Sequence, residues 1–399
     1  MSEPDLVWVV PGYPWAGDAI TGIFYRTQAR ALARRGVAPT VLVPTPLAPW
    51  PLSRLSHRWR RYADAPRVAT DGDMTILRPR YPNVAGEPAW ARPDRFIAGA
   101  AWRTAGRWSG ARLIHGHGSV TGLAAWRVAR RARLPLVLTF HGSDMNLWPD
   151  RHPDRVADLR AAARYAGPAA VIAVSQALSR QVESITGVRA TWLPLGCDHR
   201  SLAAMAVPRL EARRRLALPD ERVVVLFVGN LLAAKGVLDL AEALRTAGDQ
   251  FLGLFVGDGP AMAALRTMAG ERLRLLGPRS HDEVVRAMSA ADVLVLPSHA
   301  EGLPTVIVEA ASVGLPVIAS RAGGIPELLG DGCGTLLDGT RPEDIRAAFD
   351  WFAGHREEAR QAAERLHARV LSDYDVDTNA ARLAALYAAA TQPRGRLGA

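Results

Sequence analysis

The chain has 399 residues, of which 49% are apolar and 22% are charged. This composition excludes a disordered or fibrous protein and allows two ordinary α/β domains, each with its own core. The two cysteines, Cys197 and Cys333, are too few for a disulfide framework, which indicates a reducing compartment. The net charge of +10 is concentrated before residue 198, where 26 arginines stand against 13 acidic residues. The first half is therefore expected to meet something anionic.

The N-terminus predicts a strand and no targeting segment. Asp5 leads directly into the apolar run Leu6–Val10, without a basic flank or a long apolar core. No stretch approaches the roughly 18 apolar residues that a membrane-spanning helix needs. We therefore expect a cytoplasmic protein that is soluble or lies peripherally at the inner face of the membrane.

The first half of the chain alternates short apolar strands with amphipathic helices. Continuous apolar strands separated by helices are typical of a parallel sheet that is covered on both faces. The predicted strands are Leu6–Val10, Val37–Pro44, Thr75–Arg78, Leu113–His115, Leu136–Phe140, Ala170–Ala173 and Thr191–Leu193. The predicted helices include Ile23–Arg35, Leu123–Arg133 and Gln176–Ile185.

The same pattern ends at Leu195–Asp198 and then restarts. The strands predicted in the second half are Val223–Gly229, Phe251–Val256, Leu273–Leu276, Val293–Pro297, Val317–Ala319 and Gly334–Leu337. Two consecutive βαβ blocks predict an α/β protein with two Rossmann-like domains, residues 1–197 and 198–375, which face each other across a deep cleft. A last helix over Asn379–Ala390, within about 376–391, is expected to pack back on the first domain, ahead of a frayed tail at Pro393–Arg396.

The strongest motif consists of two glutamates, Glu301 and Glu309, with seven residues between them. It follows the strand Val293–Pro297 and opens a helix. Gly302 and Pro304 favour a tight turn, after which free N–H groups of the segment 303–306 lie at the helix N-terminus and favour an anionic phosphate. Both glutamates can then face one ligand, and two surface glutamates beside a helix start are the alternative.

A second strand-to-helix loop carries Gly229, Asn230 and Lys235, the only lysine beside 48 arginines. An ammonium binds a diphosphate as a compact point charge, unlike a planar guanidinium, which gives a physical reason for this lysine. The alternative is that the single lysine stands at this position by chance. Two more glycine turns, at Gly257–Gly259 and Gly323–Gly324, also follow predicted strands. Together these loops are expected at the carboxyl ends of strands in one sheet, where open α/β sheets bind ligands.

The first half supplies two further candidate loops. The loop from Gly17 to Gly22 enters a helix, and its glycines allow the backbone to approach a phosphate closely. His141 and Asp144 come just after the predicted strand Leu136–Phe140, where catalytic groups often lie. A structural histidine is the alternative at this position.

These motifs resemble those of the large family of retaining GT-B glycosyltransferases, which includes many bacterial mannosyl-, glucosyl- and N-acetylglucosaminyltransferases. The resemblance covers nearly the whole chain and is most specific at Glu301–Glu309, Gly229–Gly236 and His141–Asp144. The segments Gly22–Leu32 and Pro79–Pro82 look like the branch that builds cell-surface polysaccharides. The resemblance implies a GT-B fold and a retaining hexosyl transfer from a nucleotide diphosphate sugar, of UDP or GDP, without a metal or a cofactor. The implied acceptor is a glycan, a lipid-linked sugar or a small molecule.

The resemblance also implies roles for individual residues. Lys235 neutralises the diphosphate, Glu301 holds the donor sugar and Glu309 accepts hydrogen bonds from the ribose, while His141 and Asp144 lie near the reacting sugar. The implied catalytic set is His141, Lys235, Glu301 and Asp144, and the donor-binding set is Gly17, Gly22, Gly229, Asn230, Gly257, Gly302, Leu303, Pro304, Thr305, Val306 and Glu309. The family usually has arginine where this chain has Asn230, so we expect weaker neutralisation unless Arg279 or Arg321 reaches the diphosphate.

Two short sequence patterns match motifs that bind metals in other proteins. His115 and His117 have no cysteine or acid cluster nearby, so packing or substrate contact is favoured over a metal. Asp71-Gly72-Asp73 has the spelling of the divalent-ion motif of the other common sugar-transfer fold, but it precedes the strand Thr75–Arg78 and is expected to form a hairpin-like turn. We predict no metal site.

The segment Trp50–Tyr62 interleaves arginine with tryptophan and leucine, and Arg127–Arg133 adds a second basic face. Such a segment suits an acidic membrane surface or a lipid-linked or other anionic acceptor. An ordinary solvated arginine face is an equally open interpretation. Nucleic acid is not expected as a partner, because no reading helix or stacking platform accompanies the charge.

Two other functions remain open from the sequence. A nucleotide-sugar 2-epimerase also has two facing Rossmann-like domains and would convert its donor without an acceptor. A nucleotide-sugar-binding protein without turnover is a second alternative, although such a protein has no need of groups placed near the reacting carbon.

Overall fold

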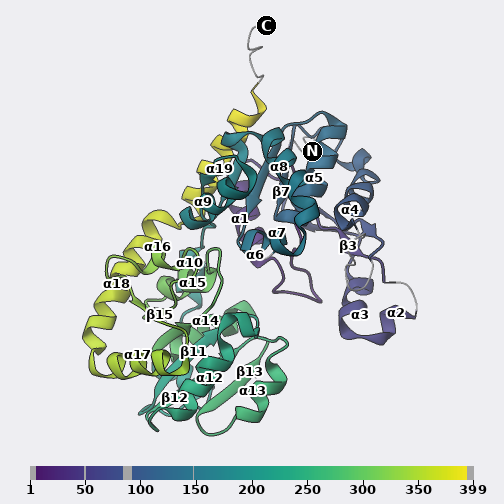
Figure 1. Ribbon diagram of the computed structural model, residues 1–399. Coiled ribbons are helices and arrows are strands. Elements are labelled where there is room, and N and C mark those ends of the chain that lie inside the picture. Colours follow the sequence, from purple (N-terminus) through teal and green to yellow (C-terminus); the bar gives the residue numbers. More distant parts are fainter. Residues whose placement is uncertain (1–5, 49–50, 84–91, 147, 393–399) are drawn as a thin grey trace. The chain divides into compact units, whose positions relative to one another are not determined.

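The computed structural model describes residues 6–48, 51–83, 92–146 and 148–392. The chain forms two compact units (Figure 1), and each is described by itself. Unit 1 comprises Met1–Gly196 with Val376–Ala399, and unit 2 comprises Cys197–Asp375. The first crossing between the units lies one residue before the predicted boundary at 197/198, and the predicted tail at Pro393–Arg396 lies outside the described residues.

Unit 1 contains an eight-stranded sheet with the strand order β10-β9-β8-β7-β1-β2-β5-β4. Its strands are β1 (Leu6–Val9), β2 (Thr40–Leu42), β4 (Val68–Asp71), β5 (Met74–Leu77), β7 (Leu113–His117), β8 (Leu136–Phe140), β9 (Val171–Ala173) and β10 (Thr191–Trp192). A separate parallel pair is formed by β3 (Thr45–Pro46) and β6 (Arg80–Tyr81). Every residue of β1, β7 and β8 is buried, which explains why these strands are mostly apolar, with His115 and His117 of β7 as buried polar exceptions.

One edge of this sheet departs from the prediction of a parallel sheet. Strand β4, which the sequence analysis did not predict, pairs with β5 in antiparallel register, with Asp71 opposite Met74. Gly72 and Asp73 make the two-residue turn, and Gly72 takes the left-handed conformation (φ 58°) that such a turn requires. The interpretation of Asp71-Gly72-Asp73 as a hairpin turn is confirmed.

The described residues of unit 1 also form helices. They are α1 (Ile23–Ala33), α2 (Leu52–Leu55), α3 (His57–Asp64), α4 (Pro93–Trp102), α5 (Ser119–Ala132), α6 (Ser143–Asn146), α7 (Trp148–Arg151), α8 (Val156–Ala166), α9 (Gln176–Thr186) and α19 (Val376–Thr391). The last helix, α19, drawn in yellow, returns to unit 1 (Figure 1), as predicted. It is fixed there by a buried hydrogen bond of 3.0 Å from Trp8 Nε1 on β1 to the hydroxyl of Tyr387.

Unit 2 contains a six-stranded parallel sheet with the order β13-β12-β11-β14-β15-β16. Its strands are β11 (Val223–Val228), β12 (Phe251–Val256), β13 (Leu273–Gly277), β14 (Val293–Leu296), β15 (Val317–Ala319) and β16 (Thr335–Leu336). Numbered from β11, this is the 3-2-1-4-5-6 strand order of a Rossmann sheet. The order in which strands are added along the sheet reverses between β11 and β14, although the two strands are parallel. Ligands bind such sheets beyond the carboxyl ends of the strands at this reversal.

The helices of unit 2 are α10 (His199–Met205), α11 (Arg209–Arg215), α12 (Val237–Thr246), α13 (Met262–Met268), α14 (His281–Ala290), α15 (Thr305–Ser312), α16 (Ile325–Leu329), α17 (Pro342–Gly354) and α18 (Arg356–Asp373). The basic stretch Arg209–Arg215 that follows the first domain is thus a helix. Its Arg213 is buried and pairs with Asp292 at 2.6 Å. This helix is therefore packed into unit 2 through the arginine.

Candidate functional site

The predicted site residues fall into two sets, one in each unit. In unit 2, the loops after β11 and β12 are in direct contact. Gly257 has a φ of 138°, and a side chain at this position would collide with the carbonyl oxygen of Gly229. The loops are also joined by a hydrogen bond of 2.9 Å from the N–H of Leu231 to the carbonyl of Asp258. Glycine at 257 is therefore required by this close approach of two backbones.

The loops after β14 and β15 meet in the same way. A side chain at Gly323, whose φ is 53°, would collide with the carbonyl oxygen of Glu301, and the N–H of Gly324 donates to the carbonyl of Gly302 at 2.9 Å. The loop after β14 also contacts the lysine loop, because the N–H of His299 donates to the carbonyl of Ala234 at 2.9 Å. All four predicted loops of unit 2 thus belong to one cluster.

Lys235 and Glu301 form an ion pair at the centre of this cluster. Lys235 Nζ donates to Glu301 Oε1 at 2.7 Å. The carboxylate is 7% exposed and the lysine side chain is 27% exposed, so water screens the pair only in part. An ammonium has three N–H donors, of which Glu301 takes one, and the charge of Lys235 stays available to a second anion.

Helix α15 begins beside this pair. Pro304 is its N-cap residue and provides no side-chain cap, and Leu303 before it is buried. In the described part of the chain, no acceptor receives the backbone N–H groups of Thr305 and Val306. A helix N-terminus of this kind places partial positive charge where an anion can bind. The turn at Gly302 and Pro304 is located as the sequence analysis predicted.

Glu309 lies on α15, whereas Glu301 lies in the loop before this helix, and Glu309 is not part of the lysine pair. Its Oε1 lies 3.5 Å from Nε2 of His281 at the start of α14. The carboxylate is 19% exposed, which leaves it accessible to a ligand's hydroxyl groups. His281 was not predicted from the sequence, since the contact joins residues of two different helices.

The expectation that Arg279 or Arg321 compensates for the lack of an arginine at position 230 stays a prediction. Asn230 is exposed. Arg279 lies 3.8 Å from Glu283 in an ion pair within the same segment, and Arg321 is exposed. Arg321 follows β15 and therefore belongs to the loop cluster together with Lys235. Lys235 is the cation that pairs with Glu301 there.

In unit 1, the loop from Gly17 to Gly22 packs against the chain around Gly12 and then leads into α1. Gly22 is the N-cap residue of α1 in the left-handed conformation, packed on the carbonyl of Gly12, and no side chain caps the helix. Gly17 lies under the indole ring of Trp15. Asp18 receives the N–H of Thr21 at 3.1 Å and pairs with Arg61 of α3 at 3.1 Å. This links the predicted phosphate loop to the basic helix.

His141 and Asp144 are brought together after β8. Both carboxylate oxygens of Asp144 accept the backbone N–H of His141, at 3.0 and 3.1 Å, and one accepts that of Gly142 at 2.6 Å. Burial raises the pKa of Asp144 to about 6, against the lowering effect of these N–H donors. Because its oxygens are occupied by the loop, Asp144 is placed to hold His141 in position, and its predicted catalytic role stays a prediction.

A buried histidine cluster stands behind His141. His117 Nδ1 lies 3.2 Å from His141 Nε2, and the rings of His115 and His117 are 3.9 Å apart. The two nitrogens of His115 bond to the hydroxyls of Tyr387, at 2.6 Å, and Thr139, at 2.7 Å. Burial lowers the pKa of His141 to about 3 and holds those of His115 and His117 well below the usual range. All three rings are therefore neutral at pH 7.

Packing or substrate contact was predicted for His115 and His117, whereas the contact with Tyr387 was not. Spacing within β7 could not reveal that one ring contacts α19 and the other contacts His141. Both ring nitrogens of His115 form hydrogen bonds with hydroxyl groups of the protein. This agrees with a packing role for His115. In the described ranges, no group of three or more His, Cys, Asp or Glu residues has the arrangement of a metal site.

The basic segment Trp50–Tyr62 forms α2 and α3 in its described part, whereas Trp50 itself lies outside the described residues. Helix α3 is amphipathic and is capped by Ser56, whose hydroxyl accepts the N–H of Trp59 at 3.3 Å. Trp59 and Tyr62 stack edge to face, with ring centroids 5.9 Å apart, and Arg60 is exposed. Within the described chain, no helix is both long and apolar enough to cross a bilayer.

Comparisons with known proteins agree with this architecture. The family model described as Glycosyltransferase Family 4 matches residues 22–200, and the model described as Glycosyl transferases group 1 matches residues 208–368. A Bacillus subtilis (strain 168) protein named as a glycosyltransferase of teichuronic acid biosynthesis is 32% identical over 390 residues, which cover 97% of this chain and 99% of that protein.

Solved structures show the same fold. Sucrose-phosphate synthase from Thermosynechococcus elongatus matches with a TM-score of 0.78 and 21% identity, over 97% of this chain and 98% of that one. Anabaena HepE in complex with UDP-glucose matches with a TM-score of 0.71 and 20% identity, over 96% and 99% of the two chains. The chain therefore has the GT-B fold and belongs to the group 1 glycosyltransferases.

Proposed function

We propose that this protein is a retaining, metal-independent hexosyltransferase that moves a sugar from a nucleotide diphosphate sugar to a glycan or lipid-linked acceptor. The observation that carries the proposal is the pairing of Lys235 with Glu301 beside the uncapped N-terminus of α15. This arrangement offers an ammonium, two free N–H groups and a buried carboxylate within one loop cluster. These are the groups that a sugar attached to a diphosphate needs.

The chemistry requires stabilisation of the charge that collects on the diphosphate as its bond to the sugar breaks. Lys235 and the N–H groups of Thr305 and Val306 are fixed before reaction, so they stabilise this charge without reorganisation. Glu301 accepts hydrogen bonds from the sugar, and Glu309 accepts those of the ribose. His141, neutral and held by Asp144 and His117, offers one hydrogen bond to the sugar. No metal or cofactor has a step in this proposal.

The acceptor side of the proposal rests on similarity and charge. The Bacillus subtilis relative is named for the biosynthesis of teichuronic acid. The basic first half of this chain and the amphipathic helix α3 suit an acceptor that is anionic or lipid-linked. We place the protein in the cytoplasm, at the inner face of an acidic membrane.

The donor is tested first by thermal stabilisation against UDP-, GDP-, ADP- and TDP-sugars. The structure of HepE with UDP-glucose favours a uridine donor. At a hundred times its Kd, the donor should stabilise the folded protein by about 2.7 kcal/mol. With that donor, the product should keep the anomeric configuration of the donor by NMR, and EDTA should not change the rate.

Four outcomes would contradict the proposal. An inverted product would exclude retention, and a rate restored only by a divalent ion after EDTA treatment would exclude metal independence. Conversion of the donor to its 2-epimer without any acceptor would favour the epimerase. Tight donor binding with no product across a panel of glycan and lipid-linked acceptors would favour a binding protein without turnover.

Membrane contact is tested by sedimentation with vesicles. We expect the protein to partition onto vesicles with 30% phosphatidylglycerol (about 1 kcal/mol per basic residue near the surface) and not onto neutral phosphatidylcholine vesicles. The variant Arg60→Glu on α3 should lose most of this binding. Arg346→Glu on α17, which is also exposed, is the charge-matched control. Equal partitioning onto both kinds of vesicle would refute membrane contact through charge.

A further inference from the structure

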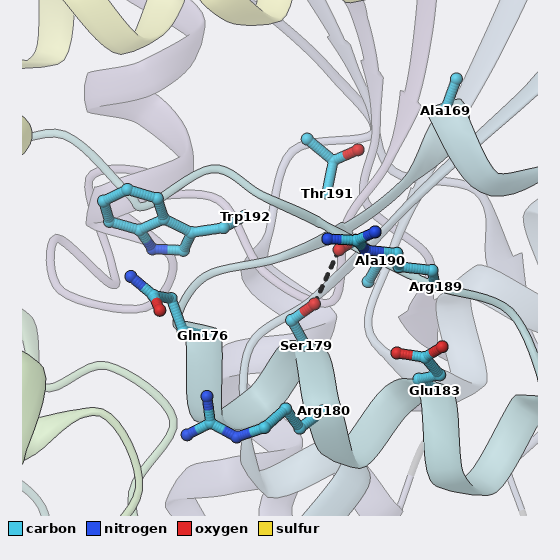
Figure 2. Close-up of a pocket in the computed structure, with 9 residues that line it drawn as sticks. All are labelled: Ala169, Gln176, Ser179, Arg180, Glu183, Arg189, Ala190, Thr191 and Trp192. Carbon is cyan, nitrogen blue, oxygen red and sulfur yellow. Dashed lines mark hydrogen bonds between the residues drawn. The ribbon is translucent and has the colours of Figure 1, made fainter.

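A pocket of about 770 Å³ lies at the β10 edge of the unit 1 sheet (Figure 2). No predicted site residue belongs to it. Its walls come from helix α9 and from the segment that leads into β10. The residues that line it are Ala169, Gln176, Ser179, Arg180, Glu183, Arg189, Ala190, Thr191 and Trp192. The volume is in the range of pockets that bind small ligands, and exceeds that of a single sugar ring.

The pocket is cationic, and its cations are not neutralised by the protein. Arg180 and Arg189 both line it and are exposed, and neither has an ion-pair partner among the described residues. Glu183 is the only acidic side chain of the lining. A third guanidinium, that of Arg382 on α19, lies 5.7 Å from the centre of the Trp192 ring. Unpaired guanidinium groups in a concave surface favour a carboxylate, which each can bind through two parallel hydrogen bonds.

The walls of the pocket are held in place by hydrogen bonds. Figure 2 shows the one from Ser179 on α9 to the carbonyl of Ala190, which measures 2.6 Å. At the end of α9, Thr186 donates to the carbonyl of Val182 at 2.7 Å and accepts the N–H of Val188 at 3.1 Å. The turn that carries Arg189 is therefore fixed to the helix that carries Arg180. A preformed site of this kind loses little entropy when a ligand binds.

Trp192 adds a flat apolar surface to the pocket. The C–H face of a pyranose ring packs on an aromatic ring, while its hydroxyls and carboxylate satisfy donors around it. An indole between guanidinium groups thus matches an acidic sugar better than an inorganic anion.

We propose that this pocket is an accessory binding site for an anionic saccharide, a pyranose unit that carries a carboxylate. The inference rests on the proposed function, in which the acceptor is a growing anionic glycan. A site away from the predicted catalytic residues would hold a distal sugar of that glycan. A second point of attachment for the glycan raises the effective concentration of the glycan's acceptor end near the catalytic residues. It also keeps the glycan bound between transfers.

Calorimetric titration tests the proposal with a hexasaccharide of alternating glucuronic acid and N-acetylglucosamine. The matched probe is the same hexasaccharide with its carboxylates reduced to alcohols. We expect the acidic probe to bind wild-type protein and the reduced one to bind roughly tenfold more weakly. The variant R180E/R189E should lose roughly tenfold or more in affinity for the acidic probe. The control R107E/R164E has the same net charge, replaces exposed arginines outside the pocket and should bind like wild type.

Trp192→Leu, which keeps the apolar bulk and removes the ring, should weaken the acidic probe without changing thermal stabilisation by the nucleotide sugar. Equal affinity of the two double variants would overturn the proposal, as would equal binding of a single-stranded oligonucleotide of the same charge. Failure of every nucleotide sugar to bind, with the hexasaccharide still bound through this pocket, would refute the proposed function and leave the saccharide site standing.

Discussion

Replacement of Lys235 by alanine should lower kcat about a hundredfold, the usual cost of removing one preorganised stabiliser of developing charge. Lys235 is the only lysine of the chain and the cation nearest to the buried carboxylate of the loop cluster. Its contribution is largest when the diphosphate carries its full charge, so kcat should fall more than the apparent affinity for the donor. The measurement is initial rates over a range of donor concentrations. The control is Arg346→Ala, an exposed arginine of the same unit.

A second variant separates this effect from a loss of folding. Lys235→Ala removes the ammonium that pairs with the 7% exposed carboxylate of Glu301, which costs stability because that charge is desolvated. In Lys235→Ala/Glu301→Gln the desolvated charge is gone, and stability should return towards that of wild type. Turnover should not return. Activity of Lys235→Ala within about threefold of wild type, or activity restored together with stability in the double variant, would refute the role of Lys235.

Replacement of His141 by asparagine should lower kcat/KM on the order of tenfold to a hundredfold, because one oriented hydrogen bond to the reacting sugar is lost. Asp144 should keep the loop in place, since its partners are the backbone N–H groups of residues 141 and 142. His117→Asn removes the contact to His141 Nε2 and the ring packing on His115 but leaves His141 in place, so its loss should be smaller and in the same direction. Steady-state kinetics with the donor found by thermal stabilisation checks both. Unchanged kcat/KM in His141→Asn would remove this residue from the proposed site.

The same variant has a signature in the pH dependence of stability. An unfolded histidine binds a proton below about pH 6.5, whereas burial keeps His141 neutral down to about pH 3. The unfolded state therefore gains protons that the native state does not, and the free energy of unfolding falls as the pH falls through this window. Between pH 7 and pH 5, wild type should lose about 2 kcal/mol more than His141→Asn. Equal losses would show that His141 is not buried neutral.

Tryptophan fluorescence during denaturant unfolding is the measurement for this signature. Ten of the eleven tryptophans precede residue 198, so the signal reports mainly on unit 1, which contains His141. Asp144 acts in the opposite sense, because its raised pKa lets the native state take up a proton near pH 6 that the unfolded state does not. This contribution is common to wild type and His141→Asn as long as the loop is kept, and it cancels in the comparison.

Elements that depend on local sequence were predictable from the chain alone. Each strand of unit 2 was located to within one or two residues, because a buried parallel strand is a short apolar run that ends at a glycine turn. The same reasoning identified the turn at Gly302 and Pro304, the start of α15 and the hairpin at Gly72. The class of enzyme followed from the resemblance of the motifs to a known family, which was visible because Glu301–Glu309 and the loop of Lys235 are continuous segments.

Contacts between distant parts of the chain were decided only by the tertiary structure. Lys235 and Glu301 are 66 positions apart and meet because the 3-2-1-4-5-6 order places β11 beside β14. Tyr387 meets Trp8 across 379 positions because α19 returns to unit 1. The sequence determined which groups this protein carries, through periodicities that act over a few residues. The structure decided which groups pair, because a side chain's partner depends on which strands become neighbours, and no short segment specifies that.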